Sequence, residues 1–131
     1  MLFPEKACIK TDKASLSLHQ EGYVKVMYAG GNLIESRDFL SVLDAIKKLS
    51  KGVKLPSLSI YPENSILSKE ILEGGLLDHR KDASIAEALV VKSFSARFWI
   101  NYYSGMIGGY PLRAFRTEES ALKWMSGFLL N

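Results

Sequence analysis

The last third of the chain, residues 87–124, alternates between patterns typical of strands and of helices. An apolar run of the kind found in buried strands, residues 88–91, precedes an aromatic helix predicted over residues 94–107. A short predicted strand, 111–115, and a helix over 117–130 follow. Two neighbouring parallel strands need a connection long enough to cross the sheet, usually a helix. This order therefore predicts a sheet with a parallel part, covered by helices.

The first two thirds of the chain carry weaker signals of the same kind. Short strands are predicted over residues 2–10, 15–19, 23–28 and 55–61. Residues 36–51 repeat apolar side chains at three- and four-residue spacing, which predicts a helix with Ser36 as its N-cap. A weaker helix is expected from Asn64 or Ser65 to about residue 72. The complete order, ββαβαβαβα, predicts one α/β domain over residues 1–131. Its mixed sheet should have four or five strands, with about four helices packed on it.

Composition and charge are those of an ordinary globular protein. Hydrophobic residues make up 47% of the 131-residue chain and charged residues 24%, a balance that disordered chains lack. The net charge of +3 is spread along the chain: residues 1–65 carry nine basic and seven acidic side chains, and residues 66–131 carry eight and seven. A nucleic-acid-binding protein concentrates basic residues on one face, so we expect no nucleic-acid partner.

The sequence also lacks the usual signals for membranes and export. No apolar segment approaches the roughly 20 residues that span a bilayer, and no signal peptide is recognisable. We therefore expect no integral membrane association and a cytoplasmic location. The single cysteine, Cys8, fits a reducing compartment. It lies in an apolar strand pattern and is expected to be a buried, unreactive thiol.

No arrangement of residues predicts catalysis. The two histidines, His19 and His79, have no spaced partners of the kind that catalytic triads or metal sites need. The glycines within residues 105–109 follow a helix and lack the Lys-Ser/Thr ending of a phosphate loop. We therefore expect a protein that is not an enzyme, with no catalytic residues, no bound metal and no cofactor.

Two segments of the C-terminal third resemble a known group of proteins. Residues 88–103 read Ala-Leu-Val-Val-Lys-Ser-Phe-Ser-Ala-Arg-Phe-Trp-Ile-Asn-Tyr-Tyr, and residues 111–124 read Pro-Leu-Arg-Ala-Phe-Arg-Thr-Glu-Glu-Ser-Ala-Leu-Lys-Trp. Together they resemble the C-terminal half of small single-domain bacterial proteins with a SpoIIAA-like fold, of the STAS/Sec14 type, most of them of unknown function. The resemblance implies a mixed sheet of four or five strands with helices packed on it.

Two functions belong to that wider fold. Sec14-like domains bind lipids or other apolar molecules, whereas anti-sigma-factor antagonists are switched by phosphorylation of a serine in an Asp-Ser-Ser/Thr-Gly run. Here the corresponding stretch reads Tyr-Pro-Glu-Asn-Ser-Ile from Tyr61 onward, so that motif is absent. Ser65 and Ser68 are candidate phosphoacceptors, because a helix N-terminus stabilises a phosphate. The simpler interpretation is that Asn64 or Ser65 caps the helix.

The helix predicted over residues 94–107 presents three different faces. One face is expected to pack on the sheet and contains Ala96, Trp99, Ile100, Tyr103 and Ile107. A polar stripe contains Arg97, Asn101 and Ser104. A second aromatic ridge contains Phe94, Phe98 and Tyr102. A helix with two apolar faces needs a second surface to pack against.

Three interpretations of the second ridge remain open. Another helix of the same domain covers it, or it forms a homodimer or partner interface, since aromatic residues and Arg favour interface centres. Alternatively, it lines a pocket for a small apolar ligand or lipid, with Arg97 and Asn101 as polar anchors and Tyr61 near the mouth. We expect a non-enzymatic binding or regulatory module that acts chiefly through protein–protein interaction, at Phe94, Arg97, Phe98, Asn101 and Tyr102. Ligand binding is the second expectation, and a phosphorylation-switched regulator is the third.

Overall fold

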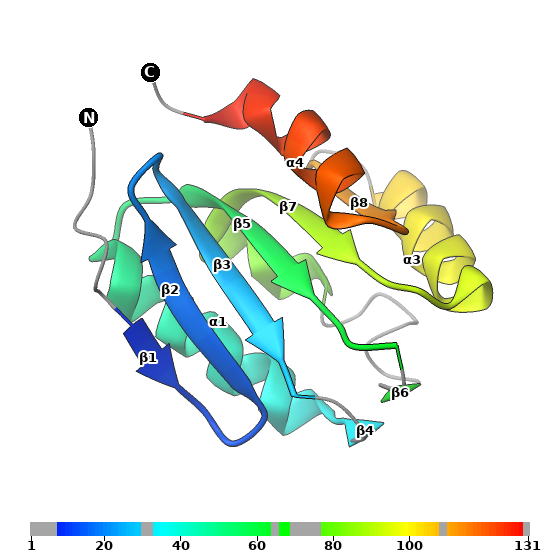
Figure 1. The fold of residues 1–131 in the computed structure, drawn as a ribbon, viewed down its shortest axis with the longest axis horizontal. Coiled ribbons are helices and arrows are strands. Elements are labelled where there is room, and N and C mark those ends of the chain that lie inside the picture. Colours follow the sequence, from blue (N-terminus) through cyan, green and yellow to red (C-terminus); the bar gives the residue numbers. More distant parts are fainter. Residues whose placement is uncertain (1–7, 30–32, 64–65, 69–76, 108–109, 130–131) are drawn as a thin grey trace.

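A six-stranded sheet lies at the centre of the fold, with the strand order β1-β2-β3-β5-β7-β8 (Figure 1). The structure, a computed structural model, describes residues 8–29, 33–63, 66–68, 77–107 and 110–129. The strands of the sheet are β1 (Cys8–Lys10), β2 (Ala14–His19), β3 (Tyr23–Tyr28), β5 (Leu55–Ile60), β7 (Ser84–Val90) and β8 (Leu112–Phe115). The pairs β1–β2 and β2–β3 are antiparallel, and the pairs from β3 through β5 and β7 to β8 are parallel. The C-terminal half of the sheet is thus parallel, as the alternation of strands and helices predicted.

Helices cover both faces of this sheet (Figure 1). The helices α1 (Ser36–Ser50) and α3 (Phe94–Ile107) lie on one face, and the shorter α4 (Glu118–Met125) lies on the other. Two short 3₁₀ helices, η1 (Leu77–Asp82) and η2 (Ser126–Phe128), add to them. The predicted mixed α/β class is therefore confirmed, although the main sheet has six strands and the described ranges contain three α-helices. None of these helices has the length and apolar content needed to cross a bilayer.

Two clusters of buried side chains hold the layers together, one on each face of the sheet. The larger cluster joins α1 and α3 to the sheet and includes Phe39, Ile46 and Ile100. The smaller cluster lies under α4 and consists of Tyr23, Leu58, Ala88, Val90, Ala121 and Met125. Because β5 and β7 are covered on both faces, their sequences read as nearly continuous buried runs.

The N-terminus of α1 differs by one residue from the prediction. Glu35, not Ser36, is the N-cap, because Asp38 in the first turn accepts a hydrogen bond from the Glu35 N–H at 2.9 Å. The same carboxylate pairs with Lys13 at 2.9 Å. At the other end, Lys51 adopts the left-handed conformation with φ of 52°, and Gly52 follows with φ of 82°.

The weaker helix expected from residue 64 or 65 to about 72 is wrong where the structure describes it. Residues Ile66–Leu67 form a short strand, β6, which pairs in parallel with β4 (Leu33–Ile34). Pairing with a segment more than 30 positions earlier has overridden a weak local helical pattern. Residues 64–65 and 69–76 lie outside the described residues, and so does the expected cap at Asn64 or Ser65.

Cys8 is exposed, which corrects the expectation of a buried thiol. It lies in β1, the first strand of the sheet, where only the middle residue is partly buried. Ile9 packs against the larger core cluster, and its neighbours point to the opposite face because side chains alternate along a strand. The apolar pattern around Cys8 belongs to an edge strand rather than to a strand covered on both faces.

Candidate functional site

Four exposed aromatic side chains share the outer side of α3. Phe94, Phe98, Trp99 and Tyr102 keep 75%, 53%, 43% and 50% of their surface accessible to solvent. We call these four residues the aromatic face. A monomeric protein normally exposes large aromatic residues singly, so a cluster of this kind is unusual. Within the described residues, the ridge predicted at Phe94, Phe98 and Tyr102 stays exposed.

Trp99 belongs to this face, although its spacing predicted that it would pack on the sheet. The inner side of α3 is narrow: Ile100 is fully buried, and Ala96 and Tyr103 are only partly buried. The indole instead packs against neighbouring rings, with ring centroids 5.3 Å from Phe98, 5.9 Å from Tyr102 and 5.8 Å from Tyr103. Phe98 also stacks on Tyr102 at 6.2 Å. These contacts order the exposed rings relative to one another.

Arg97 ties the start of α3 to the end of β7. Its guanidinium donates hydrogen bonds to the carbonyl oxygens of Val91 and Lys92, each at 2.9 Å. The guanidinium also lies 5.8 Å from the centroid of the Phe94 ring, within the range of a cation–π contact. Ser93 caps the helix, because its hydroxyl accepts a hydrogen bond from Ala96 N–H at 3.3 Å.

Asn101 ties the middle of α3 to β8. Its Oδ1 accepts a hydrogen bond from Ala114 N–H at 2.7 Å, and its Nδ2 donates one to Ala114 O at 3.3 Å. The two polar residues that the sequence offered as ligand anchors, Arg97 and Asn101, thus both bond to the backbone. Together they fix the helix that carries the aromatic face to the parallel half of the sheet.

The remaining predicted residues lie away from the aromatic face. Tyr61 is buried, and its ring stacks on Tyr28 at 4.4 Å while its hydroxyl accepts a hydrogen bond from Arg80 at 3.2 Å. Ser68 donates its backbone N–H to Ile34 O at 2.9 Å, and its hydroxyl is buried without a partner in the described part of the chain. Ser65 lies outside the described residues.

A buried polar cluster, which the sequence analysis missed, occupies the sheet face under α1. Glu87 of β7 accepts hydrogen bonds from Ser57 at 3.2 Å and Ser59 at 3.1 Å, and forms an ion pair with Arg80 of η1. The Arg80 guanidinium lies 4.0 Å from the centroid of the Phe39 ring. The signal that could have found it is a carboxylate in the middle of an otherwise apolar strand, since a buried charge needs a partner.

The surroundings of this cluster are strongly desolvated. Burial raises the pKa of Tyr28 well above its ordinary value, and the neighbouring Tyr61 raises it further. Burial also raises the pKa of Tyr110, whose hydroxyl is hydrogen-bonded to that of Ser84 at 2.5 Å. These groups therefore stay neutral near pH 7. In the described residues, the contacts of this cluster join η1, β5, β7 and α1 to one another.

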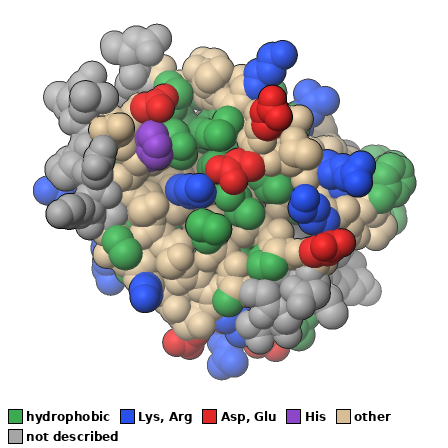
Figure 2. All heavy atoms as spheres, in the orientation of Figure 1, with side chains coloured by type: hydrophobic (Ala, Val, Ile, Leu, Met, Phe, Trp, Pro, Cys, Tyr) green, Lys and Arg blue, Asp and Glu red, His purple; other side chains and the backbone are tan. Residues whose placement is uncertain are grey.

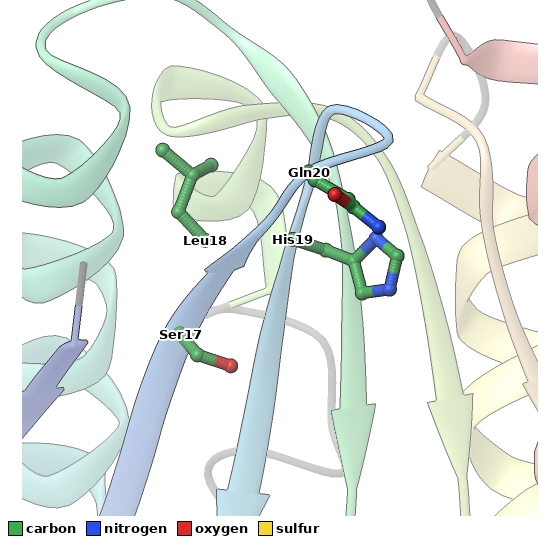
Figure 3. A pocket seen from close by; sticks show the side chains of 4 residues that line it. All are labelled: Ser17, Leu18, His19 and Gln20. Atoms are coloured by element: carbon green, nitrogen blue, oxygen red, sulfur yellow. The ribbon is translucent and has the colours of Figure 1, made fainter. Parts of the chain in front are cut away.

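A small hollow lies at the end of β2, on the opposite face of the sheet. It has a volume of about 190 Å³ and is lined by Ser17, Leu18, His19 and Gln20 (Figure 3). The His19 ring stacks on Tyr23 at 4.4 Å, and its Nδ1 accepts a hydrogen bond from Glu21 N–H. The hollow is shallow and has one ionisable side chain. Within the described ranges, no group of three His, Cys, Asp or Glu side chains is placed to hold a metal ion.

The charged residues in the segment that includes the aromatic face are all basic. Residues 88–117, which include α3 and β8, contain Lys92, Arg97, Arg113 and Arg116 but no Asp or Glu. Figure 2 shows hydrophobic side chains at the edge of the molecule where α3 lies in Figure 1, with Lys and Arg side chains and an acidic group beside them. Any acidic side chain in that view belongs to another segment. The counts of basic and acidic residues in each half of the chain did not show this local excess of basic residues.

The fold is similar to that of a solved structure at low sequence identity. No family model matches the sequence, and no curated protein matches it. The solved structure is that of an uncharacterised protein of the DUF3478 family with a SpoIIAA-like fold, from Shewanella loihica PV-4. The TM-score is 0.54 at 13% sequence identity, over 91% of this chain and 90% of the other. Identity at this level is evidence for the fold alone, and it agrees with the resemblance noted in residues 88–103 and 111–124. The chain has a SpoIIAA-like fold.

Proposed function

We propose that this protein is a non-enzymatic binding module that recognises an acidic segment of another protein through the aromatic face of α3. The observation that carries the proposal is the exposure of Phe94, Phe98, Trp99 and Tyr102 on a helix that is fixed to the sheet. Aromatic residues held in place lose little conformational entropy on binding and are frequent at the energetic centres of interfaces.

The size of the aromatic face favours a short segment of a partner. Four aromatic side chains, between 43% and 75% exposed, offer on the order of 400 Å² of accessible surface. A stable interface of standard size buries about 800 Å² on each partner. The face therefore suits a peptide-like segment, or the anchor of a larger contact, better than an obligate subunit interface.

The basic residues in 88–117 favour an acidic partner over a second copy of this chain. A homodimer through this face would bring Lys92 and Arg97 of two copies together, with no carboxylate in residues 88–117 to neutralise them. Like charges in an interface cost free energy, whereas acidic groups on a partner would gain it and would steer its approach. A cytoplasmic location is part of this proposal, because the exposed thiol of Cys8 suits a reducing compartment.

Neither of the other expected functions gains support from the geometry. A ligand pocket anchored by Arg97 and Asn101 would have to displace the hydrogen bonds that both residues make to the backbone. A phosphorylation switch at Ser68 would need its buried hydroxyl to reach a kinase. The aromatic face needs no such rearrangement before it can bind.

A peptide-display selection tests the proposal. The wild-type protein is the target, after depletion of the library on a Phe98→Ala/Tyr102→Ala double variant. We expect enriched peptides that combine aromatic or large aliphatic anchors with Asp and Glu. Their affinity should fall about tenfold or more for Phe98→Ala and should weaken as salt is added. Leu40→Ala is the matched control, because Leu40 is 45% exposed but lies on α1.

Four results would contradict the proposal. Enriched peptides without an excess of Asp and Glu would contradict the acidic partner. Peptides that bind Phe98→Ala as tightly as the wild type would show that they do not bind at the aromatic face. Sedimentation that shows a wild-type dimer and a Phe98→Glu monomer would assign the face to a second copy. Binding to vesicles of mixed zwitterionic and anionic lipids, lost in the double variant, would assign it to a membrane surface.

A further inference from the structure

The outer edge of β8 is contacted by a side chain where another strand would otherwise pair. β8 is the last strand of the sheet and pairs with β7. The carbonyl oxygens of Pro111 and Phe115 accept hydrogen bonds from the Glu87 and Val91 N–H groups beside them. Because backbone groups alternate in direction along a strand, the N–H and C=O of Ala114 point away from β7.

The Asn101 side chain occupies this outward position. Its Oδ1 lies 2.7 Å from Ala114 N and its Nδ2 lies 3.3 Å from Ala114 O. A neighbouring strand would make one bond to the same N–H and one to the same C=O, so the carboxamide imitates one residue of a strand. Both edge groups of Ala114 are thereby satisfied within the chain.

We propose that Asn101 acts as an edge clasp, which keeps β8 from pairing with the β8 strand of a second copy of this chain. Free N–H and C=O groups on an edge strand are a template for adding another strand. β8 is suited to pair with itself about a twofold axis centred on Ala114. That register places Arg113 of each copy opposite Phe115 of the other. It repeats between chains the contact that Arg113 makes at 5.6 Å from the Phe115 centroid within one chain.

Amide hydrogen exchange of Ala114 tests the first half of this proposal, which does not depend on the proposed function. In Asn101→Ala, we expect the Ala114 amide to exchange about tenfold faster than in the wild type, because its hydrogen-bond acceptor is gone. The amide of Phe115, which faces β7, should keep its exchange rate. Asn101→Asp retains an acceptor but not a donor, so the Ala114 amide should stay protected in that variant.

Sedimentation over a wide concentration range tests the second half. The Asn101→Ala variant should form dimers at concentrations where the wild type and Ser95→Ala do not. Ser95 is an exposed residue on the same helix, and its hydroxyl is hydrogen-bonded to Ser93 rather than to β8. An Ala114 amide whose exchange is unchanged in Asn101→Ala would overturn the clasp. A variant with fast Ala114 exchange that sediments like the wild type at every concentration would overturn the pairing with a second copy.

Discussion

Arg80 and Glu87 form an ion pair inside the protein, where the exposed fractions of their side chains are 1% and 0%. The pair joins η1 to β7, and through Ser57 and Ser59 it also reaches β5. Removing two charges from water is costly, so such a pair contributes little net stability over an apolar pair of the same size. Substituting only one residue of the pair, however, should lower the stability of the protein strongly.

Glu87→Gln should destabilise the protein by about 3–5 kcal/mol, because Arg80 then loses the counter-charge that the described residues supply to it. Urea unfolding measures this change in free energy. The double variant Arg80→Met/Glu87→Gln should recover part of the loss, since neither charge remains. Lys48→Gln, which breaks an exposed pair with Asp44 on α1, should change stability by less than about 1 kcal/mol. A Glu87→Gln protein as stable as the wild type would show that the ion pair is not buried as described.

Asp38→Asn should remove part of the acid sensitivity of folding. Burial opposes ionisation of Asp38, but the hydrogen bond from Glu35 N–H and the pairing with Lys13 outweigh it and lower the pKa. A carboxyl group whose pKa is lower in the folded state gives stability above its unfolded pKa of about 3.9, and this stability is lost as the pH falls through the folded pKa. At neutral pH the substitution should cost about 1 kcal/mol, the usual value of a helix cap.

Unfolding free energies measured from about pH 2 to about pH 6 check this prediction. This range extends about 2 units to either side of the ordinary carboxyl pKa. The wild-type curve should fall more steeply on the acid side than the Asp38→Asn curve. Asp44→Asn is the control, because Asp44 is exposed on the same helix. Parallel curves for the wild type and Asp38→Asn would contradict the assignment.

Phe98→Ala and Ile100→Ala should differ strongly in how much stability they remove, although the two residues are two positions apart on α3. Ile100 is fully buried, so its truncation should cost about 2–5 kcal/mol. Phe98 is 53% exposed, and its truncation should change stability by no more than about 0.5–1 kcal/mol. Thermal unfolding of the two variants measures this difference. A large loss for Phe98→Ala would mean that another part of the chain covers the aromatic face.

Strong periodic patterns predicted the elements well. The bounds of β3 and α3 agree with the prediction to the residue, because a run of β-branched and aromatic residues favours a strand and an apolar repeat of three and four residues favours a helix. The α/β class could also be predicted, since strands that alternate with helices have few arrangements. The SpoIIAA-like architecture came instead from the resemblance carried by residues 88–103 and 111–124. In the aromatic helix, the ridge at Phe94, Phe98 and Tyr102 was recognisable from spacing alone.

Contacts between distant segments could not be predicted in the same way. The strand at Ile66–Leu67 depends on its pairing with Leu33–Ile34. Trp99 was assigned to the sheet because spacing shows the direction of a side chain but not the width of the surface beneath it. The ion pair of Arg80 with Glu87 joins a polar turn to a buried strand, and neither segment alone indicates the other. The roles of Arg97 and Asn101 in holding α3 also required coordinates, because their bonds go to backbone groups.

The binding role of the aromatic face is tested most directly by the fluorescence of Trp99. Trp99 and Trp124 are the only tryptophans, so in a Trp124→Phe variant all tryptophan emission comes from the aromatic face. We expect an acidic peptide from the selection to shift this emission to shorter wavelength, with saturation at high peptide concentration. The same peptide with its Asp and Glu changed to Asn and Gln should require at least about tenfold higher concentration. Emission that stays constant while the acidic peptide is bound would show that the peptide binds elsewhere and would contradict the proposed binding role of the aromatic face.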